Sequence, residues 1–425
     1  MRHRPLAAAV LLPLLGAVAL AGCAKDNNNG GGGGNNAASC TKGADIKAAA
    51  GGGGAATTSA SATGSGGGTA TPNGKTYTIG AILPQSGPNA QLGLNESNSV
   101  QLAIEQANAS GKYPFKLKYA ISDDEGDQAK APAAAQKLID QKDVIAAVGP
   151  AFSGVTKNAQ PKFNDAHLAA ISPSATNPDL SKNNWSTFFR VVPPDDAQGV
   201  EAAKFLEKYA KKVYLVDDKS EYGVGLAKVI EDKLKADKIE VVHEGIEAGS
   251  TDYSGIATKV KGSNAGALYY AGYYSDLAKF AKALQSAGYD CLSMSGDGSN
   301  DDQLIALGGS AAENWLLSCP CADSKLIPGG QDFVAAYKAK WNTDPSTYSA
   351  EAYDATNAII TAINGISGDV TRESVLAAIK AVDYQGLTVN VKFEANGEVA
   401  GGKVNVFKVA SGKRDLMGST EDLLK

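Results

Sequence analysis

The sequence predicts an α/β protein with two lobes, each built on a parallel sheet. From residue 76 onward, short β-rich runs alternate with amphipathic runs of helical period, as in "YTIGAIL" followed by "SVQLAIEQAN". Strands separated by helices of this length favour parallel strands with helices on both faces of the sheet. About 350 residues follow residue 75, more than one such sheet usually accommodates. The extended "RVVPPDD" near Pro193, where proline forbids continuation of a helix, is therefore predicted to separate two Rossmann-like lobes.

The individual elements follow in a regular order. In the first lobe the predicted strands are "YTIGAIL", "FKLKYAIS", "VIAAVG" and "HLAAIS", with "AAAQKLID" and "GVTKNAQPKF" among the helices between them. After the boundary the alternation of helices and strands begins again with the helix "AAKFLEKYA" and the strand "VYLVDD". The further predicted strands are "IEVVHEGI", "LYYAGY", "LSMSGDG" and "NWLLSC". The tail from Thr388 has two alternating runs around "NG" and "GG" and is predicted to form a hairpin.

The N-terminus has the pattern of a secretory signal peptide over residues 1–22. Arg2 and Arg4 precede an apolar run that ends in small residues, and the run is broken by a proline and a glycine, which disfavours a transmembrane anchor. The sequence Leu20-Ala21-Gly22-Cys23 resembles the lipobox of bacterial lipoproteins. This resemblance implies that Cys23 is acylated and anchors the chain in the lipid bilayer, on the outer face of the cytoplasmic membrane.

Residues 23–75 are predicted to be a disordered linker. They are rich in Gly, Asn, Ala, Ser and Thr, and such a segment buries too little apolar surface to offset the entropy of ordering it. As a flexible tether, a chain of this length would span roughly 40 Å root-mean-square.

The charge balance argues against a nucleic-acid partner. The chain has 40 basic and 45 acidic residues, a net charge of −5, and removal of Arg2 and Arg4 with the signal peptide brings this to −7 (38 against 45). Basic residues do not cluster, as they would in a surface that binds phosphates.

Besides Cys23, four cysteines lie in a part of the chain predicted to be outside the cytoplasm, where disulfides form. They are Cys40, Cys291, Cys319 and Cys321, which allow three complete pairings, and the sequence does not choose among them. The "CPC" at 319–321 lacks the ligand spacing and the histidines of a zinc site.

An enzyme is not predicted. The histidines are His3, in the signal peptide, and His167 and His243, which fall in strand-like runs and are expected to be structural. The chain lacks a Gly-x-Ser-x-Gly elbow and a His-Glu-x-x-His motif. Pairs of adjacent aspartates, such as Asp217-Asp218, are more typical of caps and turns than of a general acid and base. No metal or other cofactor is expected.

The loops that follow the predicted strands are candidates for ligand binding, because open parallel sheets bind ligands at the carboxyl ends of their strands. They are rich in glycine, hydroxyl groups and tyrosine and poor in groups that perform covalent chemistry. The loops are "PQSGPNAQLG", "GPAFSG", "SPSATNP", "DDKSEYG", "GYYSD" and "GDGSND".

These loops resemble those of the leucine/isoleucine/valine-binding proteins, which have the type I periplasmic-binding fold and supply ABC importers. The resemblance extends from about Thr76 to the C-terminus, and its markers are "LPQSGPNAQLG", "SPSATNPDL", "VYLVDDKSEYGVGLA", "ALYYAGYYSD" and "SGDGSND". It implies three crossovers, near Val192, Cys321 and Val404, that divide the chain into a first lobe (76–192 and 322–404) and a second (193–321 and 405–425). It also implies an aliphatic, branched-chain α-amino acid as ligand, the permease of an ABC transporter as partner, and a monomer.

The same resemblance assigns roles in binding a zwitterion. Ser153 matches the residue that receives the ligand carboxylate at a helix N-terminus, which is a favourable place for an anion. Thr176 matches a residue that also holds the ligand backbone, and Ser174 one whose main-chain carbonyl accepts from the ammonium. Asp297, in the opposite lobe, matches the acid that neutralises the ammonium when the hinge closes.

The ligand side chain is expected to meet aromatic positions. Tyr222, Tyr273 and Tyr348 match such positions, and Phe152 and Leu92 complete the expected pocket. Leu92 replaces an aromatic residue, Phe152 stands where a disulfide cysteine is usual, and the acid at 297 is shorter than the common glutamate. These departures concern the preference for branched-chain side chains and leave the amino acid class as the expected ligand class. A second hypothesis stays open, a sensor of the same fold that binds an amide, urea or another small ligand.

Overall fold

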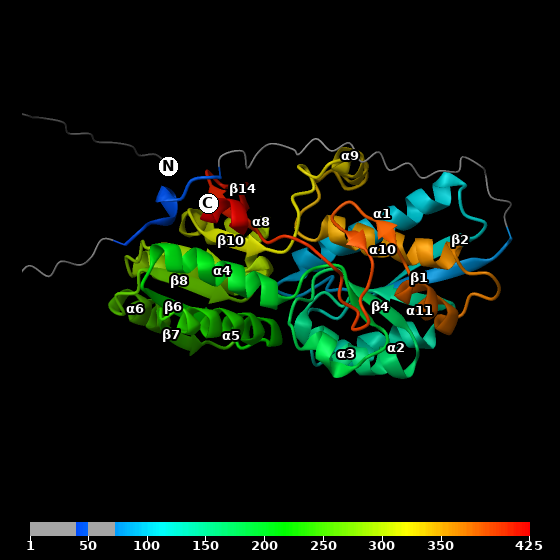
Figure 1. The fold of residues 1–425 in the computed structure, drawn as a ribbon, viewed down its shortest axis with the longest axis horizontal. Helices are drawn as coiled ribbons and strands as arrows, with labels where there is room; N and C mark the ends of the chain where they lie inside the picture. The colour runs from blue at the N-terminus through cyan, green and yellow to red at the C-terminus, as the bar shows by residue number, and fades with distance from the viewer. Residues whose placement is uncertain (1–39, 50–72) are drawn as a thin grey trace, which may run out of the picture. The chain divides into compact units, whose positions relative to one another are not determined.

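The computed structural model describes residues 40–49 and 73–425. The predicted signal peptide, Cys23 and most of the predicted linker lie outside these residues. The described residues belong to one compact unit with two lobes, each containing a sheet (Figure 1). None of the helices in these two ranges is long and apolar enough to span a bilayer.

Lobe 1 is built on a five-stranded sheet in which all neighbouring strands are parallel, as the sequence predicted. Its strand order is β2-β1-β3-β4-β5, and β3 and β4 are buried along their whole length, which explains their unbroken apolar runs. Figure 1 shows α1 and α10 on one face and α2 and α3 on the other. The strands are β1 (Thr76–Ile82), β2 (Lys116–Ser122), β3 (Val144–Val148), β4 (Ala169–Ser172) and β5 (Phe188–Arg190). The helices are α1 (Ala90–Ser110), α2 (Ala131–Asp140), α3 (Ser153–Asp165), α9 (Gly330–Trp341), α10 (Ser349–Asn364) and α11 (Arg372–Lys380), and the short η2 (Leu180–Asn183) precedes β5.

Lobe 2 contains a seven-stranded sheet with the order β14-β13-β10-β9-β8-β6-β7. The five strands from β10 to β7 are parallel, whereas β13 and β14 are antiparallel to their neighbours. The strands are β6 (Lys212–Asp217), β7 (Glu240–Gly245), β8 (Ala267–Ala271), β9 (Leu292–Ser295), β10 (Leu316–Cys319), β13 (Asn405–Ala410) and β14 (Lys413–Ser419). The helices are α4 (Asp195–Tyr209), α5 (Glu221–Ala236), α6 (Ser254–Gly262), α7 (Tyr274–Ser286), α8 (Asp302–Gly308) and α12 (Thr420–Leu424), with the short η3 (Asp297–Ser299) and η4 (Gly309–Ala312).

The chain passes between the two sheets where β5 leads into α4, where β10 leads toward α9 and α10, and where β12 leads into β13. Pro193 and Pro194 lie in the first of these segments, and Pro194 caps α4, whose first turn contains Asp195 and Asp196. In the second, the disulfide Cys319–Cys321 closes a small ring around Pro320.

The C-terminal hairpin differs from the prediction. The run 388–394 does not pair with 404–410. Instead, β11 (Tyr384–Gln385) pairs with β12 (Asn390–Val391), and Phe393 bridges Val399 around the "NG" turn. The strand β13 pairs with β14 through Ser411 and Gly412, whose φ values of 53° and 72° form a two-residue turn of the kind that joins antiparallel strands. The hairpin signal was therefore the "SG" at 411–412, while the glycines of the "GG" at 401–402 lie in the passage that leads into β13.

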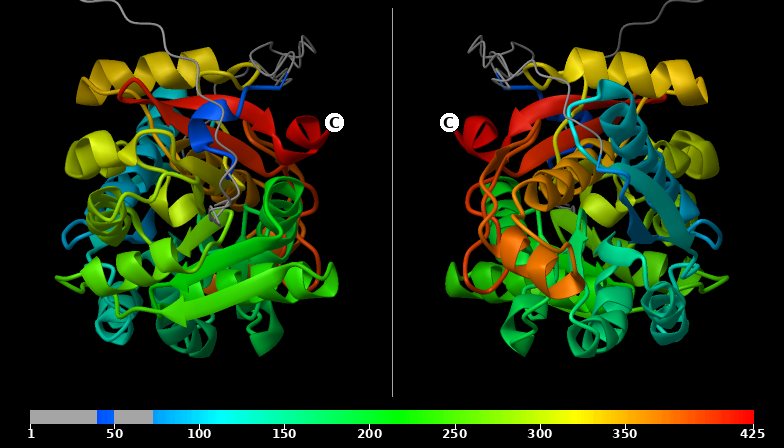
Figure 2. Two further views of the ribbon diagram at one scale, coloured as in Figure 1. Left: turned by 90° about the vertical axis from the view of Figure 1, so that its left-hand side faces the viewer. Right: turned by 90° about the vertical axis from the view of Figure 1, so that its right-hand side faces the viewer.

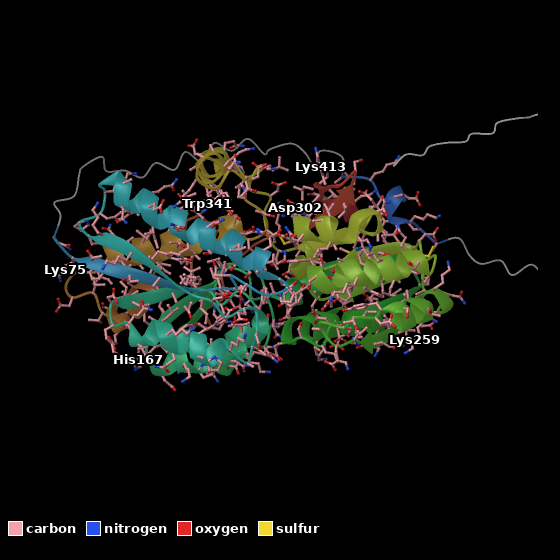
Figure 3. The ribbon with its side chains drawn as sticks, turned by 180° about the vertical axis from the view of Figure 1, so that it is seen from behind. Lys75, His167, Lys259, Asp302, Trp341 and Lys413 are labelled. Atoms are coloured by element: carbon pink, nitrogen blue, oxygen red, sulfur yellow. A yellow bond between two sulfur atoms is a disulfide. The ribbon has the colours of Figure 1, made fainter. Side chains whose placement is uncertain are left out.

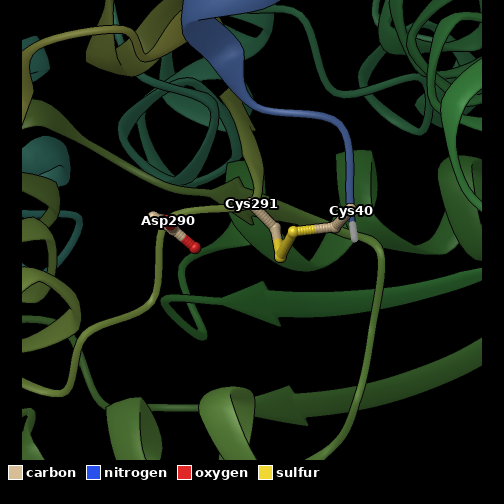
Figure 4. Close-up of side chains that lie close together, drawn as sticks. All are labelled: Cys40, Asp290 and Cys291. Carbon is tan, nitrogen blue, oxygen red and sulfur yellow. A yellow bond between two sulfur atoms is a disulfide. The ribbon is translucent and has the colours of Figure 1, made fainter. Parts of the chain in front are cut away.

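Residues 40–49 pack against lobe 2, so the prediction of a disordered linker is wrong for this segment. Cys40 is bonded to Cys291 (Figure 4), and Thr41 accepts a 2.7 Å hydrogen bond from the Leu292 backbone. The segment includes η1 (Gly43–Asp45) and lies beside β14 (Figure 2), and Ile46 enters the core of lobe 2 with 5% exposure. The disulfide, backbone hydrogen bonds and the burial of Ile46 thus attach a segment whose composition alone indicates disorder.

The attachment to lobe 2 has a topological consequence. Ala49 donates to the Met417 carbonyl in lobe 2, whereas Asn73 donates to the Pro114 carbonyl beside the first sheet. Residues 49 and 73 are thus attached to different lobes. Within the described ranges, Cys40, Asp290 and Cys291 lie close enough together to be considered as metal ligands. The two sulfurs are joined in a disulfide, so they offer no thiolates to an ion.

The two described histidines differ in their surroundings. His243 lies on β7, and its ring nitrogens are 2.8 Å from Asp217 Oδ2 and 2.8 Å from Glu231 Oε2, which makes it a paired structural residue. His167 was expected in a strand but lies in the exposed turn before β4 with φ 51°, where the chain reverses (Figure 3).

Candidate functional site

A small cavity lies between the two lobes, at the carboxyl ends of the strands. The space between its lining atoms is about 260 Å³, a figure that includes space open to solvent. The residues that line it are Leu92, Glu96, Ala151, Phe152, Ser153 and Ser174 from lobe 1, Tyr222, Tyr273, Asp297 and Gly298 from lobe 2, and Tyr348 just before α10.

The N-terminus of α3 forms one side of the cavity. Ser153 is the first residue of this helix, and Phe152 is its N-cap in an extended conformation. The first N–H groups of a helix lack partners within the helix and carry partial positive charge, so this position favours an anion. The Ser153 hydroxyl accepts a 3.2 Å hydrogen bond from the Asn177 backbone, which links the helix to the loop after β4.

Hydroxyl groups hold the loop after β4 in place. Ser172 Oγ donates to the Pro150 carbonyl (2.6 Å), and Ser174 Oγ donates to the Ala151 carbonyl (2.9 Å). These two bonds connect the loop to the segment before α3, so the two parts of lobe 1 that face the cavity are mutually fixed. Thr176 is buried in the same loop, and its carbonyl accepts from the Asp195 backbone N–H (2.8 Å).

A buried ion pair between Arg190 and Glu398 holds the loop after β4 through its carbonyl groups. The Arg190 guanidinium donates to both oxygens of Glu398, and its Nη1 donates to the carbonyls of Ala175 (2.9 Å) and Asn177 (3.0 Å). A planar, five-donor group suits this arrangement because it satisfies the carboxylate and two carbonyls at once. The loop thus has a fixed shape before any ligand arrives.

Asp297 is held by tyrosines from both sides of the cavity. Its Oδ1 accepts from the Tyr222 hydroxyl and its Oδ2 from the Tyr348 hydroxyl, each at 2.7 Å. Burial raises the pKa of Asp297, and the hydroxyls of Tyr348 and Tyr222 oppose that rise. Tyr348 has φ 64°, an uncommon value for a residue with a bulky side chain, and this backbone conformation places it at the start of α10.

Aromatic rings form another wall. The rings of Phe152 and Tyr273 are 4.6 Å apart between centroids, and those of Tyr273 and Tyr222 are 5.2 Å apart. Gly298 lies against this wall, and a Cβ atom there would come within 2.8 Å of Tyr222 Cε1 and 3.0 Å of Tyr273 Cδ1. Glycine at 298 therefore allows the loop that contains Asp297 to lie directly against the two tyrosine rings.

The lobes are in contact around the cavity. The Tyr348–Asp297 hydrogen bond and the Phe152–Tyr273 ring contact both join lobe 1 to lobe 2. Further hydrogen bonds cross between the lobes from Gln91 N to Tyr274 OH (3.2 Å), from Asn95 Nδ2 to Asp301 Oδ2 (3.1 Å), and from Asn177 Nδ2 to the Glu221 carbonyl (2.7 Å). This is the arrangement of a closed cleft.

Eight of the nine ligand-binding residues named from the sequence line the cavity, and Thr176 does not. The sequence interpretation missed Glu96, Ala151 and Gly298. Glu96 lies one helical turn after Leu92 on α1 and so shares its face of the helix, which is the signal that could have identified it. Of the aspartate pairs, Asp301 caps α8 by accepting from Gln303 N, as expected of a structural residue.

Two α/β lobes that enclose a small cavity, with a helix N-terminus on one side and a carboxylate on the other, define a cleft-type ligand-binding protein. A sequence profile of the periplasmic binding proteins matches residues 76–414, and the chain belongs to this family. This is a family of binding proteins, in agreement with the prediction that the chain is not an enzyme.

Individual relatives agree with this assignment. The chain is 31% identical over 329 residues to the leucine-, isoleucine-, valine-, threonine- and alanine-binding protein of Pseudomonas aeruginosa, covering 76% of this chain and 87% of that protein. Among solved structures, a leucine-binding protein from Thermotoga maritima superposes with a TM-score of 0.75 at 25% identity, covering 81% of this chain and 98% of that one. The substrate-binding protein of a branched-chain amino acid transporter from Streptococcus pneumoniae, in complex with isoleucine, gives a TM-score of 0.73 at 28% identity, covering 80% and 98%.

Proposed function

We propose that the protein is an extracytoplasmic solute-binding lipoprotein that captures an aliphatic, branched-chain amino acid between its lobes and delivers it to an ABC importer. The observation that carries this proposal is the pairing, across one small cavity, of the α3 N-terminus with the buried Asp297 carboxylate. These two groups complement the two charges of a free α-amino acid.

In the proposed complex the ligand carboxylate lies at Ser153 and the first N–H groups of α3. The ammonium lies between Asp297 and the main-chain carbonyl of Ser174, and Thr176 supports the ligand backbone from its buried loop. The ligand side chain packs against Leu92, Phe152 and the tyrosines of the aromatic wall. The names of the relatives, which bind leucine, isoleucine and valine, support this ligand class.

Hinge bending is proposed to open and close the cleft. Flexure at the passages near Val192, Cys321 and Val404 would separate Tyr348 from Asp297 and admit the ligand, with each lobe's interior unchanged. Closure is driven by the ammonium, because only the closed cleft brings the acid of lobe 2 to the ligand held on lobe 1.

The remaining parts of the proposal concern presentation at the membrane. Cys23, acylated after removal of residues 1–22, anchors the protein on the outer face of the cytoplasmic membrane, and the permease subunits of the importer accept the ligand from the closed monomer. The lipobox and the signal-peptide pattern support this part.

One observation favours a second candidate, a sensor for a small neutral amide or urea. Both Asp297 oxygens already accept a tyrosine hydroxyl, so this carboxylate is satisfied without a cation. A neutral ligand would leave that arrangement intact.

A thermal-shift screen of residues 40–425 distinguishes the two candidates. L-leucine, L-isoleucine and L-valine are compared with isovaleramide, acetamide and urea. A ligand present at 100 times its Kd stabilises the folded protein by about 2.7 kcal/mol. Stabilisation by the amino acids alone supports the transport protein, and stabilisation by an amide or urea alone supports the sensor.

A further inference from the structure

Glu96 is a buried carboxyl group for which the proposed function has no role. It lies on α1, lines the cavity and has 0% exposure. Among the described residues, neither of its oxygens has a hydrogen-bond partner. An unsatisfied buried carboxyl is costly, so its position at a ligand cavity requires an explanation.

The groups that face Glu96 are acidic. Burial raises the pKa of Glu96 well above its ordinary range, and two acids, Asp124 after β2 and Glu351 on α10, add to this rise. The Ser174 hydroxyl faces Glu96 and opposes this rise of its pKa in part, although it donates its proton to the Ala151 carbonyl. Asp297 faces the same cavity from lobe 2.

The described residues that line the cavity include no Lys, Arg or His. The nearby buried Arg190 is fully engaged with Glu398 and two loop carbonyls, as described above. Two carboxyl groups, one from each lobe, therefore share a cavity of about 260 Å³ to which the protein brings no cation. A cation that pairs with both carboxyl groups therefore has to come with the ligand.

We propose that Glu96 is a second partner for the ligand's ammonium, opposite Asp297, and that it gives up its proton to solvent when the ammonium binds. This inference rests on the proposed function, since it concerns the same ligand. It specifies the ligand class further as primary ammonium compounds and excludes carboxylic acids that lack the amine. In this arrangement lobe 1 contributes Glu96 and lobe 2 contributes Asp297, and closure of the cleft brings both carboxyl groups to the ligand's ammonium.

The inference predicts a link between binding and pH. In the empty cavity, burial and the surrounding acids favour the neutral form of Glu96, whereas the bound ammonium favours the ionised form. The complex then holds fewer protons than the free protein and ligand, so affinity rises with pH until Glu96 is ionised in the free protein as well. The maximum slope is tenfold in Kd per pH unit for one proton released.

The experiment is calorimetric titration of the protein with L-leucine at pH 6 and pH 8, in two buffers of different ionisation enthalpy. The difference in heat between the buffers gives the number of protons released per ligand. We expect release approaching one proton at pH 6 for the wild type. Glu96→Gln is expected to release none and to bind leucine about 10- to 100-fold more weakly at pH 8, because a charged hydrogen bond becomes a neutral one.

Glu351→Gln is the matched control. Glu351 is also a buried glutamate, with a pKa raised to about 8 by burial, but it does not line the cavity and its Oε1 accepts from Ala322 N (2.8 Å). Because Glu351 also disfavours the ionisation of Glu96, this variant should release somewhat less than the wild type at pH 6 but, unlike Glu96→Gln, should still release a proton. The amine-free 2-hydroxy-4-methylpentanoate should bind weakly to every variant and release no proton.

Leucine binding to the wild type without proton release would overturn the inference, and this measurement does not depend on the folding of any variant. Release that persists in Glu96→Gln would also overturn it, since another group would then be the source. A different failure, in which L-leucine, L-isoleucine and L-valine all fail to bind the wild type, would reject the proposed function instead.

Discussion

Replacement of Asp297 tests how the site distinguishes a zwitterion from a neutral ligand. Asp297 is 3% exposed and its two oxygens are held by Tyr222 and Tyr348, one on each side of the cavity. In Asp297→Ala the ligand ammonium would lose its charged partner inside a closed cleft, and both tyrosine hydroxyls would lose their acceptor. Loss of one member of a buried charged pair costs roughly 2–5 kcal/mol, which corresponds to about 30- to several-thousand-fold in Kd.

Two further variants separate charge from shape. Asp297→Asn keeps the size of the side chain and an oxygen acceptor for one tyrosine but removes the charge, so its loss should approach that of the alanine variant. Ser153→Ala removes one hydroxyl while the helix N–H groups of α3 remain, so a smaller loss of about 1–3 kcal/mol is expected.

The assay is calorimetry with L-leucine on the three variants and on Asp218→Asn as a control. Asp218 is likewise a buried aspartate of lobe 2, but it accepts from Ser220 at the start of α5 and does not line the cavity. Affinity within threefold of the wild type in Asp297→Ala would refute the reasoning, because no ammonium could then be paired with this acid.

Three other predictions concern the cavity wall, the stability and the anchor. Gly298→Ala should weaken leucine binding by at least tenfold, because the new methyl group would lie 2.8 Å from Tyr222 Cε1; calorimetry would contradict this by giving an unchanged Kd. Burial raises the pKa of Asp124 to about 7, so Asp124 binds its proton more tightly in the folded protein than in the unfolded chain. The free energy of unfolding therefore falls as the pH rises from about 4 to 7. Asp124→Asn keeps an acceptor for Gly126 N and should raise stability at pH 8 by up to about 4 kcal/mol but not at pH 4, as measured by urea unfolding; equal effects at both pH values would count against it. Cys23→Ser should release the protein from membranes with leucine binding unchanged, and retention of the variant after a salt wash would require a different anchor.

Much of the fold could be predicted because the lobes follow regular sequence patterns. The short, largely apolar runs of β3 and β4 and the amphipathic helices between strands indicate a parallel sheet by their period and length alone. The rule that ligands bind at the carboxyl ends of the strands selected the loops that contain Ser153, Ser174 and Asp297, which the structure brings to one cavity.

The features that sequence reasoning missed depend on long-range contacts. Glu96 is a polar residue on a long helix, a position that usually faces solvent, and only the packing of α10 and the loops buries it. The order of residues 40–49 depends on the bond from Cys40 to Cys291, which are 251 positions apart. Thr176 was named from the motif of its loop, and the structure buries it outside the cavity lining, where its carbonyl accepts from the Asp195 backbone N–H, a contact with α4 that no local pattern reveals.

The central claim, that the cavity binds both charges of an amino acid, is tested most directly by comparing L-leucine with two analogues that each lack one charge. These are isoamylamine, which has the ammonium and the side chain, and 4-methylpentanoate, which has the carboxylate and the side chain. Calorimetry on the wild-type protein should show that each analogue binds at least 100-fold more weakly than leucine, because each leaves either the α3 N-terminus or the acids unpaired. Binding of isoamylamine or of 4-methylpentanoate as tight as that of leucine would contradict the account.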